Sequence, residues 1–215
     1  MQRLRLTSLI AILTVILAVA ALSPAYASCV RSISYTVFNN STFTYYALDQ
    51  NYTSGFAATV VNKLTYNTTT NKAAIVRFHL DANTASGAYI ELSFWANKEL
   101  HVWYNDGSTN VEIGAGYWES GNDTKLTVTE DGVISVVDYE GNYVVKNYGI
   151  GAVTLYWVGG HGETTNSIAT SGYVTVSVGT VEGSDVTSAV TPWIPVIVTF
   201  AMLGVALSFI KKFGS

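Results

Sequence analysis

The side chains best suited to chemistry are aromatic, and they gather in the middle third of the chain. Trp95 and Trp103 fall on the strand faces opposite their aliphatic neighbours. Their rings therefore form a layer that is either exposed or covered by a second sheet, a loop or a partner. Aromatic platforms stack on sugar rings and also anchor protein interfaces. We expect a ligand-binding or interface surface made of Trp95, Trp103, Trp118, Tyr104 and Tyr117.

The histidines and aspartates lack the spacing of a known metal motif. His79, His101 and His161 form neither H-x-H nor H-E-x-x-H. We expect His79 and His101 on solvent-facing strand faces and His161 in a glycine loop. A structural calcium ion is the alternative, and its candidate ligands are Asp49, Asp81, Asp106, Asp131 and Asp138. Asp-Gly pairs are typical hairpin residues and the regular D-x-D-x-D-G loop is absent, so no cofactor is predicted.

A glycosidase would need two carboxylates that face each other across a cleft. Glu91 with Glu112 or Glu119 could supply such a pair, but alternation places them on exposed strand faces as ordinary polar residues. The sequence has no G-x-S-x-G motif and no glycine-rich phosphate loop between a strand and a helix. The sequence therefore predicts a protein that is not an enzyme.

Apolar and polar residues alternate with a period of two along most of the chain, which indicates β-strands. The predicted strands cover residues 32–37, 43–48, 58–64, 74–80, 89–96, 100–104, 111–118, 126–129, 133–139, 143–145, 152–158 and 173–181. Turn residues separate them at Asn105-Asp106-Gly107, Asp131-Gly132 and Glu140-Gly141-Asn142, and a polar loop is expected over Gly159–Ser171. About twelve short strands predict an all-β, antiparallel two-sheet β-sandwich of the jelly-roll type over residues 28–181.

The clearest meander runs from Lys125 to Asn147. Its segment KLTVTEDGVISVVDYEGNYVV resembles the back-sheet hairpins of concanavalin-like lectin and laminin-G-type jelly rolls. The resemblance implies a sandwich, and no site residue is carried over from it.

The first 27 residues have the composition of a secretory signal peptide. Arg3 and Arg5 precede an apolar run, and Ala25 and Ala27 supply the small residues of a cleavage site. Two alternatives are an uncleaved N-terminal anchor and a lipid on Cys29.

Residues 193–210 have the composition of a membrane-spanning helix. These eighteen residues carry no charge, and Lys211 and Lys212 follow them in the short tail 211–215. A helix needs roughly 20 apolar residues to cross the hydrocarbon core, and lysines at its end stay on the cytoplasmic side. The expected anchor residues are Trp193, Ile194, Phe200, Leu203, Leu207, Ile210, Lys211 and Lys212. A buried core helix, a cleaved tail and a tail exchanged for a lipid are the alternatives.

The remaining composition fits an exported domain held by a polar linker, residues 182–192. Residues 28–191 carry seven basic and all fifteen acidic side chains, a net charge of −8, which argues against nucleic-acid binding. The single cysteine, Cys29, excludes an internal disulfide, and it is expected either to pair between chains or to be a free thiol in a mobile terminus. Glycosylation sequons begin at Asn39, Asn40, Asn51, Asn67 and Asn122.

Together these features predict a single-pass membrane protein with a glycosylated extracellular domain. The first hypothesis is a structural surface protein that assembles with copies of itself or with other surface components, as in an envelope coat, a pilus-like thread or a virion surface. The second is a lectin-like or adhesin-like module that binds carbohydrate or protein through the aromatic face or the Gly159–Ser171 loop. Exposure of the tryptophans along a groove would favour the second hypothesis.

Overall fold

The structure is a computed structural model, and it describes residues 29–82 and 87–181. The predicted signal segment with Ala25 and Ala27, the linker, the transmembrane segment with its anchor residues and the basic tail lie outside the described residues. Those assignments therefore stay predictions. Within the described ranges, no helix has both the length and the apolar character needed to cross a membrane.

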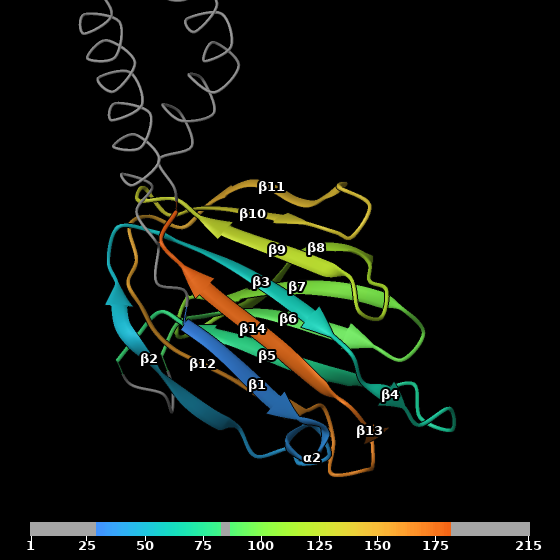
Figure 1. Cartoon of the computed structure of the whole chain (residues 1–215). Helices are drawn as coiled ribbons and strands as arrows, with labels where there is room; N and C mark the ends of the chain where they lie inside the picture. The colour runs from blue at the N-terminus through green and yellow to red at the C-terminus, as the bar shows by residue number, and fades with distance from the viewer. Residues whose placement is uncertain (1–28, 83–86, 182–215) are drawn as a thin grey trace, which may run out of the picture.

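The described chain forms two six-stranded antiparallel sheets that face each other (Figure 1). The first sheet contains, in spatial order, β1 (Cys29–Ser34), β14 (Tyr173–Gly179), β3 (Phe56–Asn62), β9 (Asp123–Val128), β10 (Val133–Val137) and β11 (Tyr143–Gly149). The second sheet contains β2 (Thr44–Tyr52), β12 (Leu155–Gly162), β5 (Ala73–His79), β6 (Tyr89–Trp95), β7 (Glu99–Asn105) and β8 (Asn110–Tyr117). The predicted all-β fold with antiparallel sheets is confirmed.

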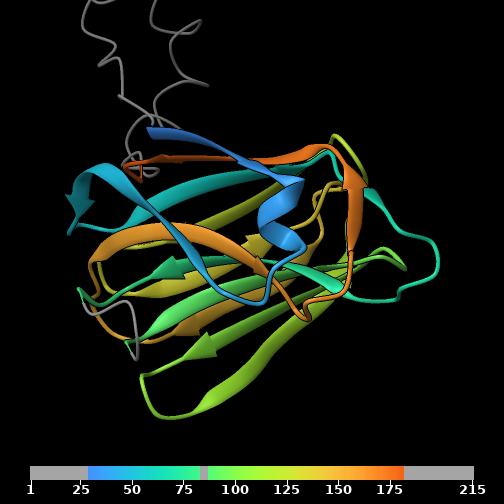
Figure 2. The same ribbon diagram turned by 90° about the horizontal axis from the view of Figure 1, so that it is seen from below.

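One end of the sandwich carries two small elements. A two-stranded ribbon pairs β4 (Thr65–Tyr66) with β13 (Ala169–Ser171). The one-turn helix α2 (Tyr35–Phe38) follows β1 and packs against β12 and β13, as the view from below shows (Figure 2). These elements close the end of the apolar core between the two sheets.

The core forms because alternate residues of both sheets point inward, as the period-two pattern predicts. On β6, Ile90 and Leu92 are 0% exposed and Phe94 is 1% exposed. Phe56 of β3 and Phe78 of β5 stack across the sandwich with ring centroids 6.0 Å apart. Each large apolar side chain buried in this way contributes about 1.5–3 kcal/mol to folding, and the two sheets are held together by that burial.

The predicted reversals occur where the glycines allow a positive φ. Gly107, Gly132 and Gly141 have φ values of 97°, 75° and 88°. In the first turn, one carboxylate oxygen of Asp106 accepts hydrogen bonds from the backbone amides of Ser108 and Thr109. The Asn-Asp-Gly, Asp-Gly and Glu-Gly-Asn turns are therefore confirmed.

Two predictions of local structure are wrong. The alternation predicts a strand at residues 35–37, but they belong to α2, because the Ser34 hydroxyl accepts a hydrogen bond from the Thr36 amide and Phe38 then enters the core. The glycines predict a loop at residues 159–162, but these residues continue β12. A side chain at Gly159 would overlap the carbonyl of Thr44, and one at Gly162 would overlap that of Phe38. These glycines allow close packing within a strand.

The two sheets come closest along one edge of the sandwich, where β8 meets β11. A Cβ atom at Gly114 would overlap the carbonyl oxygen of Val144, and one at Gly116 would lie 2.7 Å from a Val144 methyl group. The glycine-punctuated sequence of β8 therefore permits the close backbone approach that it predicts.

Cys29 is the first residue of β1 and is paired with Val178 of β14. Its side chain is 5% exposed, and within the described ranges it forms no disulfide. The prediction that Cys29 lies in a mobile terminus is therefore wrong, because the cysteine belongs to a strand.

Candidate functional site

The site lies on the outer face of the second sheet, the face that points away from the first sheet. Strand register places Tyr45, Gly159, Arg77, Glu91, Trp103 and Glu112 in one row across this face. The next row runs through His161, Ile75, Ser93, His101 and Ala115. The face therefore combines aromatic, acidic and imidazole side chains, whereas the inner face of the same strands is mainly apolar.

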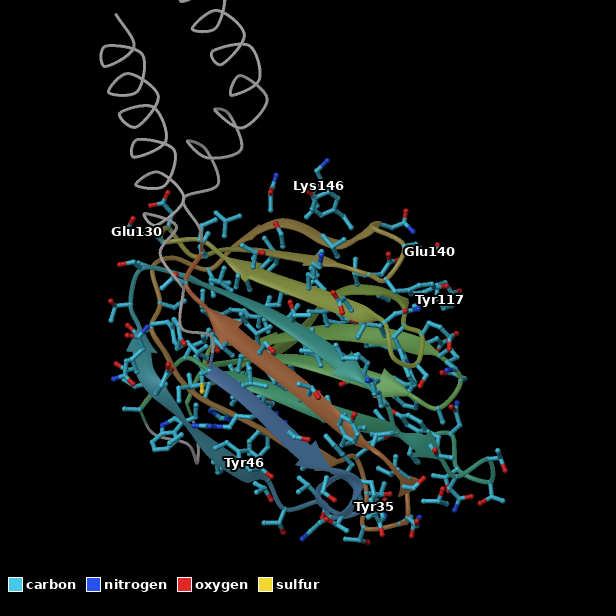
Figure 3. The ribbon with its side chains drawn as sticks, viewed as in Figure 1. Tyr35, Tyr46, Tyr117, Glu130, Glu140 and Lys146 are labelled. Atoms are coloured by element: carbon cyan, nitrogen blue, oxygen red, sulfur yellow. The ribbon has the colours of Figure 1, made fainter. Side chains whose placement is uncertain are left out.

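Three of the five predicted aromatic residues lie on this outer face. Trp95 and Trp103 are half-buried, and Tyr117 is 63% exposed at the rim of the domain (Figure 3). Trp95 ends β6, Trp103 lies on β7 and Tyr117 ends β8. The prediction that Trp95 and Trp103 lie opposite their aliphatic neighbours agrees with the register.

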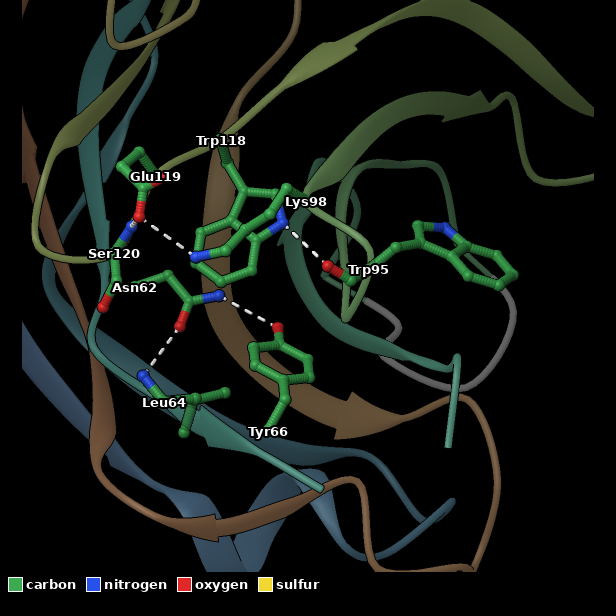
Figure 4. Close-up of polar contacts among 8 residues, drawn as sticks. All are labelled: Asn62, Leu64, Tyr66, Trp95, Lys98, Trp118, Glu119 and Ser120. Carbon is green, nitrogen blue, oxygen red and sulfur yellow. Dashed lines mark hydrogen bonds and ion pairs between the residues drawn. The ribbon is translucent and has the colours of Figure 1, made fainter. Parts of the chain in front are cut away.

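The other two aromatic residues point into the sandwich. Trp118 is 2% exposed, and its ring packs edge-on against Phe94 with centroids 5.8 Å apart. Its indole nitrogen donates a hydrogen bond to the carbonyl oxygen of Trp95 at 2.9 Å, while the Trp95 ring points away from it (Figure 4). Tyr104 packs beside Tyr148 of β11, with ring centroids 6.1 Å apart. Trp118 and Tyr104 therefore do not belong to the outer face, and their predicted role in a ligand-binding or interface surface stays a prediction.

A hollow of about 170 Å³ opens on the outer face next to Tyr117. It is lined by Glu99, His101, Ala115, Gly116 and Tyr117, and we call it the Tyr117 hollow. Its floor is low because Ala115 and Gly116 carry little or no side chain. The Trp95 ring lies 5.8 Å, centroid to centroid, from the His101 ring that lines the hollow.

His101 lies between two carboxylates. Its Nδ1 atom lies 2.5 Å from Oε1 of Glu112, and its Nε2 atom lies 3.6 Å from Oε2 of Glu99. The imidazole is therefore fixed in orientation by β8 on one side and by its own strand on the other. Glu99 and Glu112 remain 47% and 39% exposed at their side chains, so carboxylate oxygens face solvent.

Beside this group, Arg77 and Glu91 form an ion pair that is largely closed to solvent. The guanidinium Nε donates to Oε2 of Glu91 at 2.7 Å, and the Ser93 hydroxyl donates to Oε1 at 2.8 Å. The guanidinium stacks over the Tyr89 ring, 4.0 Å from its centroid. Glu91 is only 6% exposed, so this pair supports the outer face and offers no accessible carboxylate.

Two histidines of this face are withdrawn from solvent, in contrast to the prediction for His79. His79 is 2% exposed, because the rings of Phe43, Tyr45 and Tyr89 surround it at 5.2–5.5 Å. Within the described part of the chain, neither ring nitrogen of His79 has a hydrogen-bond partner. Desolvation by burial and, secondarily, the charge of Arg77 lower the pKa of His79 to about 4, while Asp81 opposes this shift. His79 is therefore neutral at physiological pH. His161, on β12, is half-buried, and burial likewise lowers its pKa.

The carboxylates considered for catalysis have separate partners. Glu91 binds Arg77, Glu112 contacts His101, and Glu119 pairs with Lys98 at 3.1 Å. Among residues 29–82 and 87–181, no group of three or more histidine, cysteine, aspartate or glutamate side chains is placed to hold a metal ion. The candidate calcium ligands Asp106 and Asp138 instead accept backbone amides in their own turns.

The five sequons differ in accessibility. Asn40, Asn51 and Asn122 are exposed, and Asn67 is half-buried in the predicted turn before β5. Asn39 is different, because its side-chain oxygen accepts the amides of Ile168 and Ala169 and its nitrogen donates to the Ala169 carbonyl at 2.8 Å. Asn39 is therefore a structural residue that ties the end of α2 to the start of β13.

The predicted ligand-binding surface does not contain Glu99, His101 or Glu112. The sequence carries a signal for the first two, because Glu99, His101 and Trp103 follow one another at spacing two and so share a strand face. The position of Glu112 depends on how β7 pairs with β8, and a bulge between Val102 and Trp103 shifts that pairing. That shift brings Glu112 to His101, which no sequence pattern shows.

No protein-family model matches the sequence, and no curated protein matches it. Several solved structures are similar to it. The metal-free exoplasmic/lumenal domain of VIP36 is 15% identical, with a TM-score of 0.45, 75% of this chain covered and 87% of that domain. The Emp46p carbohydrate recognition domain is 10% identical, with a TM-score of 0.45, and the match covers 70% of this chain and 87% of that domain. Galectin-Ib from Xenopus laevis is 8% identical, with a TM-score of 0.40, and the match covers 63% of this chain and 99% of the galectin.

Proposed function

We propose that this protein binds carbohydrate through the outer face of its second sheet. The observation that carries the proposal is the Tyr117 hollow, where an exposed tyrosine, a histidine and a glutamate surround a small depression beside Trp95. These side chains do not serve the apolar core, and their arrangement suits a ligand of sugar size.

The aromatic side chains suit the apolar faces of a sugar ring. Tyr117 exposes 63% of its surface, far more than the buried tyrosines of the domain. A pyranose presents C–H groups on its faces, and these pack on the electron-rich face of an aromatic ring. Tyr117 supplies such a platform at the hollow, and Trp95 on β6 and Trp103 on β7 add further aromatic rings to the same face of the sheet.

The polar side chains suit the hydroxyl groups of the same ring. The exposed oxygens of Glu99 and Glu112 are acceptors for sugar hydroxyls, and carboxylates make stronger hydrogen bonds than neutral acceptors do. His101 holds the two carboxylates in place. Less side-chain conformational entropy is therefore lost when the ligand binds. Apolar walls with a few fixed polar groups are typical of small-ligand sites.

A glycan array tests the proposal. The full-length chain, purified in a zwitterionic detergent without a sugar headgroup, is expected to bind a subset of glycans. Tyr117→Ala is expected to weaken binding about tenfold or more, because alanine removes the stacking platform. Tyr143 on β11 of the first sheet is 58% exposed, so Tyr143→Ala is a matched control that keeps binding. Absence of binding to every glycan, or equal effects of the two substitutions, would contradict the proposal.

Self-assembly into a surface layer stays a prediction. Membrane anchoring, extracellular location and the absence of enzymatic activity likewise stay predictions.

A further inference from the structure

The charge around the Tyr117 hollow is unbalanced, and this imbalance bears on which sugars it accepts. Three basic residues belong to the second sheet or to the turns that lead into β5–β7, within the described ranges: Lys72, Arg77 and Lys98. Each is already paired with a carboxylate, Lys72 with Glu163 at 3.3 Å, Arg77 with Glu91 at 2.7 Å and Lys98 with Glu119 at 3.1 Å. The charge of each of these three cations is therefore neutralised by its own carboxylate partner.

Glu99 and Glu112 are the surplus charges, and both face the hollow or its edge. They share the single imidazole of His101 as a partner. One imidazole carries at most one positive charge, so two ionised carboxylates around it leave a net charge of −1 when His101 is protonated and −2 when it is neutral. A hydrogen bond from Asn97 is the main cause that lowers the pKa of Glu99, which keeps that carboxylate ionised at neutral pH.

We infer that the Tyr117 hollow accepts neutral or amino sugars and rejects sugars that carry carboxylate, sulfate or phosphate groups. The inference rests on the proposed carbohydrate binding at this site and adds its selectivity. An acidic group placed over Tyr117 meets the exposed oxygens of Glu99 and Glu112, while the described cations of this sheet are held by other carboxylates. Like charges brought together at a binding surface act against the wrong ligand, and an amino group in the same place is attracted.

The test compares matched glycans on the array, each neutral glycan beside its sialylated and sulfated derivative. For the wild-type full-length chain, we expect acidic derivatives to bind about tenfold more weakly than their neutral parents at low salt. Raising NaCl from about 0.05 M to about 0.5 M should reduce that ratio, because the Debye length falls below the size of the site.

A charge-matched pair of variants locates the effect. Glu99→Gln with Glu112→Gln should bring the neutral-to-acidic ratio close to one. The control Glu130→Gln with Glu140→Gln changes the net charge equally at turns of the first sheet and should keep the wild-type ratio. The ratio is the measured quantity, and a loss of affinity common to both ligands cancels from it. If the site variant binds too weakly to measure, the salt dependence of the wild-type ratio tests the inference, and a ratio that does not fall at high salt contradicts it.

The outcomes separate this inference from the proposed function. Binding of neutral and acidic glycans with equal strength by the wild-type chain would overturn the selectivity and leave carbohydrate binding standing. An equal change of the ratio in the control variant would show that net charge, and not Glu99 and Glu112, sets the preference. Absence of binding to all glycans would overturn the proposed function, and the selectivity with it.

Discussion

The indole nitrogen of Trp118 donates a hydrogen bond to the backbone carbonyl of Trp95, and the two rings lie on opposite faces of the second sheet. The bond joins the residue that follows β8 to the last residue of β6. Trp118 thus holds the edge of the sheet from the core side, while Trp95 stands beside the Tyr117 hollow on the outer side. Two tryptophans that look equivalent in the sequence have different functions, and mutation separates them.

Trp118→Ala is expected to destabilise the protein by about 3–5 kcal/mol, because it leaves a large cavity next to Phe94 and removes the bond to Trp95. Trp95→Ala should cost less than about 1 kcal/mol, since its ring is half-buried on the outer face. Denaturant unfolding followed by circular dichroism measures both. Equal losses would contradict the assignment of Trp118 to the core and Trp95 to the surface.

Acid should destabilise the fold through His79. Its pKa is about 6.5 when unfolded and about 4 when folded, so the unfolded chain binds the proton first. The contribution of neutral His79 to the free energy of unfolding is complete above pH 6.5. It falls by about 3 kcal/mol in total as the pH drops from about 6.5 to about 4. His161, whose pKa is also lowered chiefly by burial, adds a change in the same direction.

His79→Phe tests this prediction, because phenylalanine fills a similar space without a titrating group. The variant is expected to show a flatter dependence of unfolding free energy on pH between 6.5 and 4. The His101→Gln variant, which alters a partly exposed histidine of the same face, serves as the comparison. An unchanged pH profile in His79→Phe would show that His79 does not control acid stability.

Gly114→Ala should destabilise the sandwich by about 1–3 kcal/mol, because the new methyl group would overlap the Val144 carbonyl where β8 meets β11. A Cβ atom added at Gly149 would meet no heavy atom of the described residues within 4 Å, and the φ of Gly149 is not positive. Gly149→Ala is therefore the matched control and should change stability little. Thermal unfolding distinguishes the two variants. If Gly114→Ala unfolds at the wild-type temperature, β8 and β11 do not approach as closely as this contact requires.

Asn39 and Asn40 should behave differently although both begin sequons. In a host that glycosylates exported proteins, peptide mapping by mass spectrometry is expected to find no glycan on Asn39, whose amide is used in the fold. Asn39→Ala should lower stability by about 1–3 kcal/mol, because it leaves buried backbone groups unpaired. Asn40→Gln should be neutral for stability. A glycan on Asn39 in the folded protein would contradict its hydrogen bonding to Ile168 and Ala169.

The sequence predicts the sandwich well because alternation is a local signal. Ile90, Leu92 and Phe94 point inward as their spacing requires, and the Asp-Gly turns follow from glycine at positive φ. The errors come from interactions between distant segments. Phe43 and Tyr45, at the start of β2 and more than thirty residues away in sequence, bury His79, and Glu112 reaches His101 only through a bulge. The burial of His79 and the contact of Glu112 depend on tertiary packing, which a short stretch of sequence does not show.

A nuclear magnetic resonance titration of the tryptophan indole N–H signals shows whether glycan binds on the outer face of the second sheet. The full-length chain, labelled with ¹⁵N-tryptophan in detergent without a sugar headgroup, is titrated with the glycan that binds best on the array. We expect the signals of Trp95 and Trp103 to shift with increasing glycan, while the signal of buried Trp118 changes little. Signals of Trp95 and Trp103 that stay unchanged at saturation, whichever other tryptophan shifts, would contradict carbohydrate binding at the Tyr117 hollow.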